Sequence, residues 1–267
     1  MTLLKGTHSV IGMIHVDPLP GTPGYKGSFA QVLEKAVSEA EIYRNAGVDM
    51  LAIENMHDIP YLNRKVGPEI VAGMTVVGSA VKSTAQIPCG IQILAGANQD
   101  ALAVALAANL DFIRAEGFVF SHIADEGPIH SDAGVLLRYR KQIGAEHIHV
   151  FTDIKKKHSA HAITGDLSIE ETARAAEFFL SDGVIITGTA TGSAADHHEV
   201  DRVSQAVNIP VLVGSGVTLD NLERFLLTAN AVIVGSWFKK GGHWSETLDP
   251  DRVKAFMDKA QKLRASI

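Results

Sequence analysis

The chain has 267 residues, of which 46% are hydrophobic and 20% are charged, and its formal net charge is −6. This length and hydrophobic content suffice for a large packed domain, and the negative charge excludes a chain-wide surface for nucleic acid or anionic membranes. The one cysteine, Cys89, excludes an internal disulfide and a zinc site built on cysteines. We therefore expect a reducing, cytoplasmic setting, and we expect no membrane span because the apolar runs are short.

Short runs rich in valine and isoleucine alternate with longer helical patterns along the chain. The runs predict strands at Ser9–Val16, Val48–Asn55, Cys89–Ala95, Asp111–Gly117, His147–Ile154, Val184–Thr189, Pro210–Gly214 and Ala231–Gly235. The helical patterns cover Phe29–Ala46, Pro68–Ser83, Gln99–Asn109, Asp132–Ile143, Ser168–Leu180, Ala195–Val207, Leu219–Leu227 and Asp251–Ala265. Strands that alternate with helices predict a parallel sheet, and eight such units at this length predict a single (β/α)8 TIM barrel over residues 1–267.

Residues typical of helix ends agree with these predicted elements. Gly47 and Gly183 each precede a predicted strand and are expected at helix C-caps, while Ser168 with Glu171 predicts a capping box. The alternative fold is an open, doubly wound sheet. That fold favours a GxGxxG motif after its first strand, whereas the first strand here leads into HVDPLPGTPGY.

Nearly every predicted strand becomes polar at its carboxyl end, which is where TIM barrels place their active sites. Buried ionised groups are unfavourable unless they are paired, so this repetition favours a functional site over ordinary strand-to-loop transitions. The candidate side chains at these ends are His15, Asp17, Glu54, Asn55, Gln92, Arg114, Glu116, Asp153, Lys155, Lys157, His158, Thr187 and Thr189.

The segment VFTDIKKKHSAH, residues 150–161, joins the fifth predicted strand directly to a run of charge. Asp153, Lys155 and Lys157 share one face if the chain stays extended, and Arg114 and Glu116 share a face of the preceding strand. Opposite charges in a pocket shift pKa values, and a lysine beside other cations can act as a base or a Schiff-base nucleophile. The alternative for the lysines is a solvated surface run.

Two glycine-rich loops follow the seventh and eighth predicted strands. Gly214, Ser215 and Gly216 form one, and Gly235 and Ser236 form the other, with Lys239 and Lys240 just after it. Glycine allows the backbone to approach a ligand, and phosphate sites in TIM barrels frequently use these two loops. The sequence therefore predicts a phosphate site here.

Residues 118–133 form a long predicted loop, of the kind that often acts as a lid or a binding loop. The loop contains His122, Asp125, Glu126 and His130, which are possible ligands of a divalent metal. No rigid spacing such as HExxH is present, so a metal and its identity stay open, and no other cofactor is expected.

The motifs VIGMIHVDPLPGTPGY, GVDMLAIENMHDIPY, FIRAEGF, TDIKKKHSAH, TGTATG, VLVGSGVTLDNL and VGSWFKKGG occur in this order. Together they resemble the BtpA/SgcQ family over essentially the whole chain. The resemblance implies a barrel similar to the ribulose-phosphate-binding TIM barrels, with phosphate at strands seven and eight. It places family motif positions on His15, Asp17, Glu54, Asn55, Arg114, Asp153, Lys157 and His158. Glu116 stands where many members have Asn, and strand three ends in ILAGAN, so the non-phosphate end of a substrate stays open.

Three functions remain open from the sequence. The first is an enzyme acting on a phosphorylated sugar or sugar-like metabolite, as an isomerase, epimerase or carbon–carbon lyase. In it, Asp153 with Lys155 or Lys157, Glu54 and Glu116 would transfer protons, while Arg114 or a lysine stabilises an enolate oxygen. The second, which the family name implies, is a non-catalytic factor for photosystem I biogenesis. The third is a metal-dependent phosphohydrolase or nucleotide-sugar hydrolase. By fold analogy we also expect a homo-oligomer.

Overall fold

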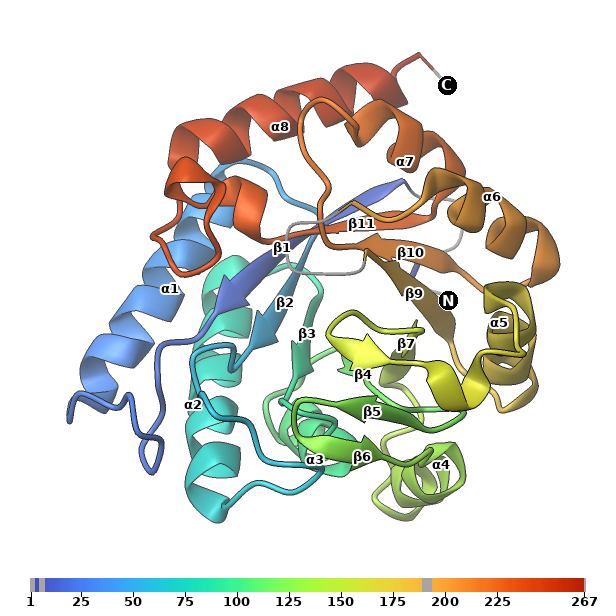
Figure 1. Ribbon diagram of the computed structural model, residues 1–267. Coiled ribbons are helices and arrows are strands. Elements are labelled where there is room, and N and C mark those ends of the chain that lie inside the picture. Colours follow the sequence, from blue (N-terminus) through green and yellow to red (C-terminus); the bar gives the residue numbers. More distant parts are fainter. Residues whose placement is uncertain (1–2, 5–7, 189–193, 267) are drawn as a thin grey trace.

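Eight parallel strands close into a barrel in the computed structural model of the chain, which describes residues 3–4, 8–188 and 194–266 (Figure 1). The strands are β1 (Ser9–His15), β2 (Met50–Glu54), β3 (Cys89–Gln92), β4 (Phe112–Ala115), β7 (His149–Ile154), β9 (Gly183–Thr187), β10 (Val211–Gly214) and β11 (Ala231–Val234). They follow one another around the ring in this order, and β11 pairs with β1. The closed ring confirms the predicted TIM barrel and excludes the open sheet.

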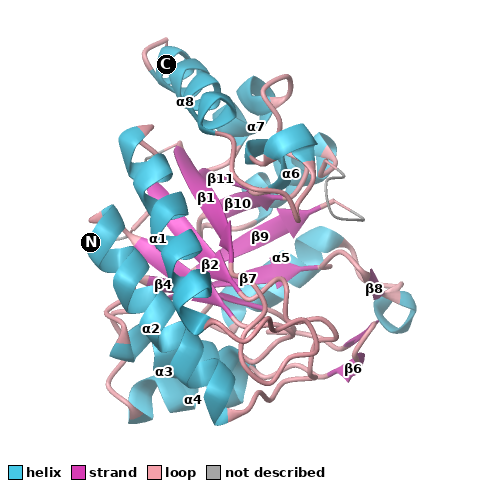
Figure 2. Cartoon of the chain, turned by 90° about the vertical axis from the view of Figure 1, so that its left-hand side faces the viewer, coloured by secondary structure: helices cyan, strands magenta, loops and turns pink. Residues whose placement is uncertain are grey.

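The predicted helices surround this ring (Figures 1 and 2). They are α1 (Phe29–Asn45), α2 (Pro68–Ala85), α3 (Asn98–Ala107), α4 (Ala133–Gln142), α5 (Ile169–Phe178), α6 (His197–Ala206), α7 (Leu222–Thr228) and α8 (Pro250–Arg264). Helix α7 begins three residues later than predicted. There the Asn221 side chain accepts from the Thr218 amide and donates to the Gly216 carbonyl, which ties the preceding residues into a turn.

Two of the three local predictions hold. Gly47 takes a left-handed φ of 74° after α1. The Ser168 hydroxyl accepts from the Glu171 amide while the Glu171 carboxylate accepts from the Ser168 amide, which is the predicted capping box. The C-cap prediction at Gly183 is wrong, because Leu180 takes the left-handed φ of 66° instead. Gly183 lies inside β9, where a Cβ atom would come within 2.9 Å of the Phe151 ring.

Side-chain alternation along the strands divides the core into two layers. One set packs between the strands and the helices, and a second set fills the interior of the barrel. The interior set contains Leu4, Ile11, Met13, Met50, Ala52, Phe112, Phe151, Ile185, Leu212, Ala231 and Ile233. Gly90 lacks a side chain where the Phe112 ring lies, so this glycine makes room for the aromatic filling of the barrel.

The loops after β4 and β7 join in a small antiparallel sheet. Its strands are β5 (His122–Ala124), β6 (Gly127–Ile129) and β8 (Ser159–Ala160), in the order β6-β5-β8. The Arg64 guanidinium donates to the carbonyls of Gly117 and His130 and pairs with Asp132, which fixes both ends of the long loop. Short helical turns η1 (Ala162–Thr164), η2 (Ser236–Phe238) and η3 (Lys240–Gly242) complete the connections. None of the helices that the structure describes has the length and hydrophobicity needed to cross a bilayer.

Candidate functional site

The polar strand ends converge at the carboxyl mouth of the barrel because they continue its inward-facing rows. In β2, Met50 and Ala52 point into the barrel, so Glu54, two residues further on, does the same. The register pairs His15 with Glu54 and Glu54 with Gln92, which places these three side chains in one layer. Arg114 follows Phe112, and Asp153 follows Phe151, in the same way. The strand order therefore assembles a buried polar layer above the apolar side chains that fill the barrel interior.

Two adjoining chambers, which share four lining residues, open above this layer. Glu54, Met56, Arg114 and Lys157 line both chambers. The first chamber also contacts Met13, His15, Ser215, Gly216, Val217, Thr218, Ile233, Gly235, Ser236, Trp237 and Gly242. The second chamber also contacts Tyr61, Gln92, Leu94, Ala95, Glu116, Asp125, Glu126, Asp153, Lys156, His158 and Trp244. Their empty volumes, including space open to solvent, are about 660 and 830 Å³.

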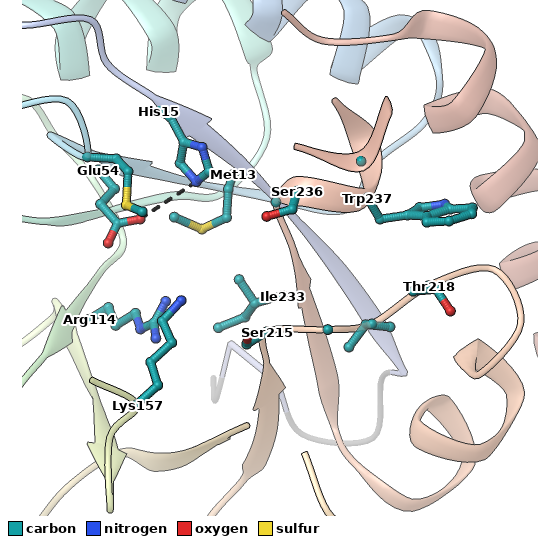
Figure 3. Close-up of a pocket in the computed structure, with 15 residues that line it drawn as sticks. Met13, His15, Glu54, Arg114, Lys157, Ser215, Thr218, Ile233, Ser236 and Trp237 are labelled. Carbon is teal, nitrogen blue, oxygen red and sulfur yellow. Dashed lines mark ion pairs between the residues drawn. The ribbon is translucent and has the colours of Figure 1, made fainter. Parts of the chain in front are cut away.

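The two glycine-rich loops form one wall of the first chamber, opposite the charged side chains (Figure 3). Ser215 and Gly216 have left-handed φ values of 77° and 64°, so the backbone turns sharply after β10. At Gly235 a Cβ atom would lie 3.3 Å from the His15 imidazole, so glycine allows the ring to approach the loop. Gly214 is the exception, because it ends β10 and packs against Ile185 rather than lining the chamber.

Arg114 and Asp153 form a buried, two-pronged ion pair between neighbouring strands. The Arg114 Nη2 and Nε atoms donate to the Asp153 carboxylate at 3.0 and 3.2 Å. Burial raises the pKa of Asp153, and the charge of Arg114 opposes that rise. The pair fixes the guanidinium at the junction of the two chambers, where it can bind a negatively charged oxygen.

The lysine run does not follow the predicted alternation. Strand β7 ends at Ile154, and Lys155 then takes a left-handed φ of 45°, which reverses the side-chain order. The Lys155 ammonium donates to the Leu167 carbonyl and lines neither chamber. Lys156, which we did not select from the sequence, points into the second chamber instead. Its ammonium donates to Glu116 Oε2 at 2.9 Å, and Gln92 Nε2 donates to Glu116 Oε1 at 2.9 Å.

Lys157 lies at the junction of the two chambers. Its backbone amide donates to the Thr187 hydroxyl at 3.1 Å, which positions the residue. In the part of the chain that the structure describes, no carboxylate forms an ion pair with its ammonium group. Burial and the neighbouring Arg114 charge lower the pKa of Lys157, and Figure 3 shows the two cationic side chains converging. The charges of Glu54, Asp153 and Glu116 oppose this fall, and the amine loses its proton more readily than that of an exposed lysine.

His15 and Glu54 form a second pair of ionisable groups at the first chamber. His15 Nε2 lies 3.8 Å from Glu54 Oε2, and His15 Nδ1 lies 3.1 Å from the Trp244 carbonyl. Burial, reinforced by the charge of Lys239, lowers the pKa of His15 to about 3, so the imidazole is neutral. Burial raises the pKa of Glu54, and Arg114 and Lys157 oppose this effect.

Several predicted ligand-binding residues hold the scaffold instead. Asn55 accepts from the Leu94 amide and donates to Asp58, so both ends of its amide are used within the protein. Asp17 pairs with Lys35 and lines neither chamber. The Thr187 hydroxyl accepts a hydrogen bond from the Lys157 backbone amide. His158 does line the second chamber, with a left-handed φ of 53°, and Thr189 lies outside the described residues.

The lysines after β11 do not line the first chamber. Lys239 is 1% exposed and donates to both carboxylate oxygens of Glu39 at 2.6 and 2.8 Å, so it closes a buried ion pair behind the barrel wall. Lys240 is exposed to solvent.

Three of the four metal-ligand candidates in the long loop are spread over the β5–β6 hairpin, and His130 follows it. His122 is buried, with its ring centroid 5.5 Å from that of His161, while Asp125 and Glu126 occupy the turn beside the second chamber. No group of three or more His, Cys, Asp or Glu side chains in the described residues is arranged to hold a metal ion.

Comparison with known proteins places this architecture in a family. The model of the BtpA family matches residues 6–262. An uncharacterized mitochondrial protein of Caenorhabditis elegans is 51% identical over 96% of this chain and 94% of its own length. The photosystem I biogenesis protein BtpA of Synechocystis is 34% identical over 94% of this chain and 88% of its own length.

A solved structure shares the fold at low sequence identity. The (S)-3-O-geranylgeranylglyceryl phosphate synthase of Thermoplasma acidophilum, in complex with sn-glycerol-1-phosphate, superposes with a TM-score of 0.61 at 15% identity. It covers 98% of this chain and 99% of its own. This likeness shows the fold, and the relatives at higher identity show the family. The chain is a member of the BtpA family.

Proposed function

We propose that this protein is an enzyme that binds a phosphorylated sugar or sugar-like metabolite at the barrel mouth and transfers a proton to or from its carbon skeleton. One observation carries the proposal. A wall of glycine-rich backbone and a layer of buried charges face each other across the same cleft, and Lys157 and Arg114 lie where they meet.

The phosphate group would bind in the first chamber. Ser215 and Gly216 on one loop and Gly235 and Ser236 on the other offer backbone and hydroxyl groups without a Cβ barrier at either glycine. The synthase of similar fold from Thermoplasma was solved with a glycerol phosphate, which supports a phosphate ligand for this architecture. Arg114 adds a fixed positive charge toward the centre of the cleft.

Lys157 would act as the general base or acid. Its depressed pKa and the lack of an ion-pair partner in the described residues leave the amine available for proton transfer. Glu54, with its raised pKa, is placed to return a proton to a neighbouring carbon or oxygen. Arg114, held by Asp153, would stabilise the oxygen of an enolate formed in between. This chemistry is common to isomerases, epimerases and carbon–carbon lyases.

Deuterium exchange tests the proposal without knowledge of the product. Phosphorylated aldoses and ketoses of different chain length are incubated with the protein in D2O, and loss of C–H signals is followed by proton NMR. We expect exchange next to the carbonyl of at least one compound. Lys157→Met should abolish it, because the base is removed.

Lys155→Met is the matched control, since that ammonium contacts the Leu167 carbonyl outside both chambers. It should exchange deuterium as fast as the unmodified protein. No exchange with any compound, or equal exchange in both lysine variants, would contradict the proposal.

A role in biogenesis, without catalysis, is the alternative that one relative supports. The Synechocystis protein is named for photosystem I biogenesis. A purely structural role predicts that Lys157→Met and Lys155→Met have equal effects on the cell, whereas catalysis predicts that only the first loses function. The cytoplasmic setting stays a prediction. Because the worm relative is named as mitochondrial, fractionation of the native cell is the experiment that tests it.

A further inference from the structure

One residue that lines the second chamber carries a buried acceptor without a partner among the described residues. Gln92 is 2% exposed and lines this chamber, and its Oε1 atom has no hydrogen-bond partner among the described residues. A buried amide oxygen without a partner is unfavourable, so such an atom in a cleft indicates a missing donor.

The orientation of the Gln92 amide follows from its neighbours. Its Nε2 atom donates to Glu116 Oε1 at 2.9 Å, and Glu116 Oε2 accepts from Lys156 at 2.9 Å. Burial alone would raise the pKa of Glu116, but the Lys156 charge and hydrogen bond lower it, so Glu116 is an ionised carboxylate that only accepts. The NH2 side of Gln92 must therefore face Glu116, and the free atom is the acceptor oxygen.

Part of the wall of this chamber is apolar and aromatic. Tyr61, Leu94, Ala95 and Trp244 line the chamber, and the Trp244 ring packs against His57 at 5.0 Å between centroids. Tyr61 uses its hydroxyl on the Met56 carbonyl at 2.7 Å. An aromatic ring would pack against this apolar part of the wall, beside the charged groups that line the rest of the chamber.

The rim of the chamber carries negative charge. Asp125, which is exposed, and Glu126, which is half-buried, form the turn of the β5–β6 hairpin beside it. Carboxylates at this position disfavour a second anionic group at the far end of the ligand.

From this geometry we infer that the substrate is a phosphate ester whose far end is a flat, uncharged or cationic heteroaromatic ring with an N–H group that donates to Gln92 Oε1. The phosphate occupies the first chamber, the reacting carbon lies between Lys157 and Arg114, and the ring fills the second chamber. The inference rests on the proposed function and narrows its substrate class from sugar phosphates in general to ring-bearing ones.

Isothermal titration calorimetry tests this with probes that share one phosphate end. Inorganic phosphate and ribose 5-phosphate are compared with the common ribonucleoside 5′-monophosphates, which add an N–H-bearing ring to the same ribose phosphate. We expect at least one nucleotide to bind about ten-fold or more tightly than ribose 5-phosphate, because only the ring satisfies the buried acceptor.

Gln92→Met should remove this advantage and leave the affinity for ribose 5-phosphate unchanged. Gln142→Met makes the same replacement on the exposed face of α4 and should change neither affinity. Because Gln92 is buried, Tyr61→Ala in the loop after β2 is the second variant, and it should weaken nucleotide binding alone.

The outcomes separate the two proposals. Nucleotides that bind no more tightly than ribose 5-phosphate, or an advantage that persists in both Gln92→Met and Tyr61→Ala, overturn the inference and leave the proposed function standing. No binding of any phosphate compound, inorganic phosphate included, overturns the proposed function and the inference with it.

Discussion

The Lys156 ammonium donates a 2.9 Å hydrogen bond to the Glu116 carboxylate inside the barrel mouth, with side-chain exposures of 10% and 6%. Lys157, the next residue, has no such carboxylate partner in the described chain. Adjacent lysines thus have opposite roles: one neutralises a buried acid, and the other keeps its amine available. This difference is the basis of the first prediction.

Lys156→Met should destabilise the protein by about 3–5 kcal/mol, because it leaves the buried Glu116 carboxylate without compensation. Lys157→Met should change the free energy of unfolding by less than about 1 kcal/mol, since no ion pair is lost. Urea denaturation monitored by circular dichroism measures both. Adding Glu116→Gln to Lys156→Met should recover part of the lost free energy of unfolding. No recovery would show that the loss does not come from the unpaired Glu116 carboxylate.

Lys239→Met should also lower the free energy of unfolding by about 3–5 kcal/mol. It leaves the Glu39 carboxylate, which is 4% exposed, without its ion-pair partner. Lys240→Met, at the exposed neighbouring lysine, should stay within about 0.5 kcal/mol of the unmodified protein. Neither should alter phosphate affinity at fixed folded concentration. A loss of phosphate binding in folded Lys239→Met would show that this lysine contributes to phosphate binding at the glycine-rich loops.

Gly216→Val should lower the affinity for inorganic phosphate about ten-fold or more, because a β-branched residue disfavours the left-handed φ of 64° and distorts the loop. Gly144→Val is the matched control: Gly144 has a φ of 71°, lies after α4 and has open space around it. Both should lose stability in thermal unfolding, but only Gly216→Val should lose binding in calorimetry. Equal affinities in the two variants would remove the loop after β10 from the phosphate site.

The buried His15 makes stability depend on pH. Its pKa is about 3 in the folded protein against 6.5 when unfolded, so the unfolded chain binds the extra proton between these values. The stability that this histidine contributes is complete above pH 6.5 and is lost as the pH falls toward 3. From pH 7 to pH 5 the loss is on the order of 2 kcal/mol. His15→Gln should show a correspondingly smaller decrease in the free energy of unfolding over this interval, and an identical decrease would mean that His15 is not the cause.

Much of the fold follows from the sequence because hydrophobic periodicity is local. The apolar runs predicted the correct order of barrel strands, and side-chain alternation correctly predicted that Arg114 and Asp153 face the barrel mouth. The same rule failed at Lys155, because a left-handed φ reverses the parity of the side chains and no sequence signal marks a non-glycine residue in that conformation.

Residues contributed by loops were harder to predict for a different reason. Trp244 reaches the cleft from a connection after β11, where no period specifies which side chains turn inward. Asn55 matched a family motif, but both polar atoms of its side-chain amide form hydrogen bonds within the protein, to Leu94 and Asp58. A motif reports that a side chain is required, and only the contacts distinguish support from ligand binding.

The pairing of β5 with β8 has a mechanical consequence. Ile123 and Ala124 in the loop after β4 are joined by backbone hydrogen bonds to Ala160 and Ser159 in the loop after β7. The hairpin turn borders the second chamber, and the segment just before β8 carries Lys156 and Lys157. The hairpin that borders the chamber and the segment that carries both lysines are therefore linked through the backbone. We expect a ligand that displaces the hairpin to shift Lys156 and Lys157 as well.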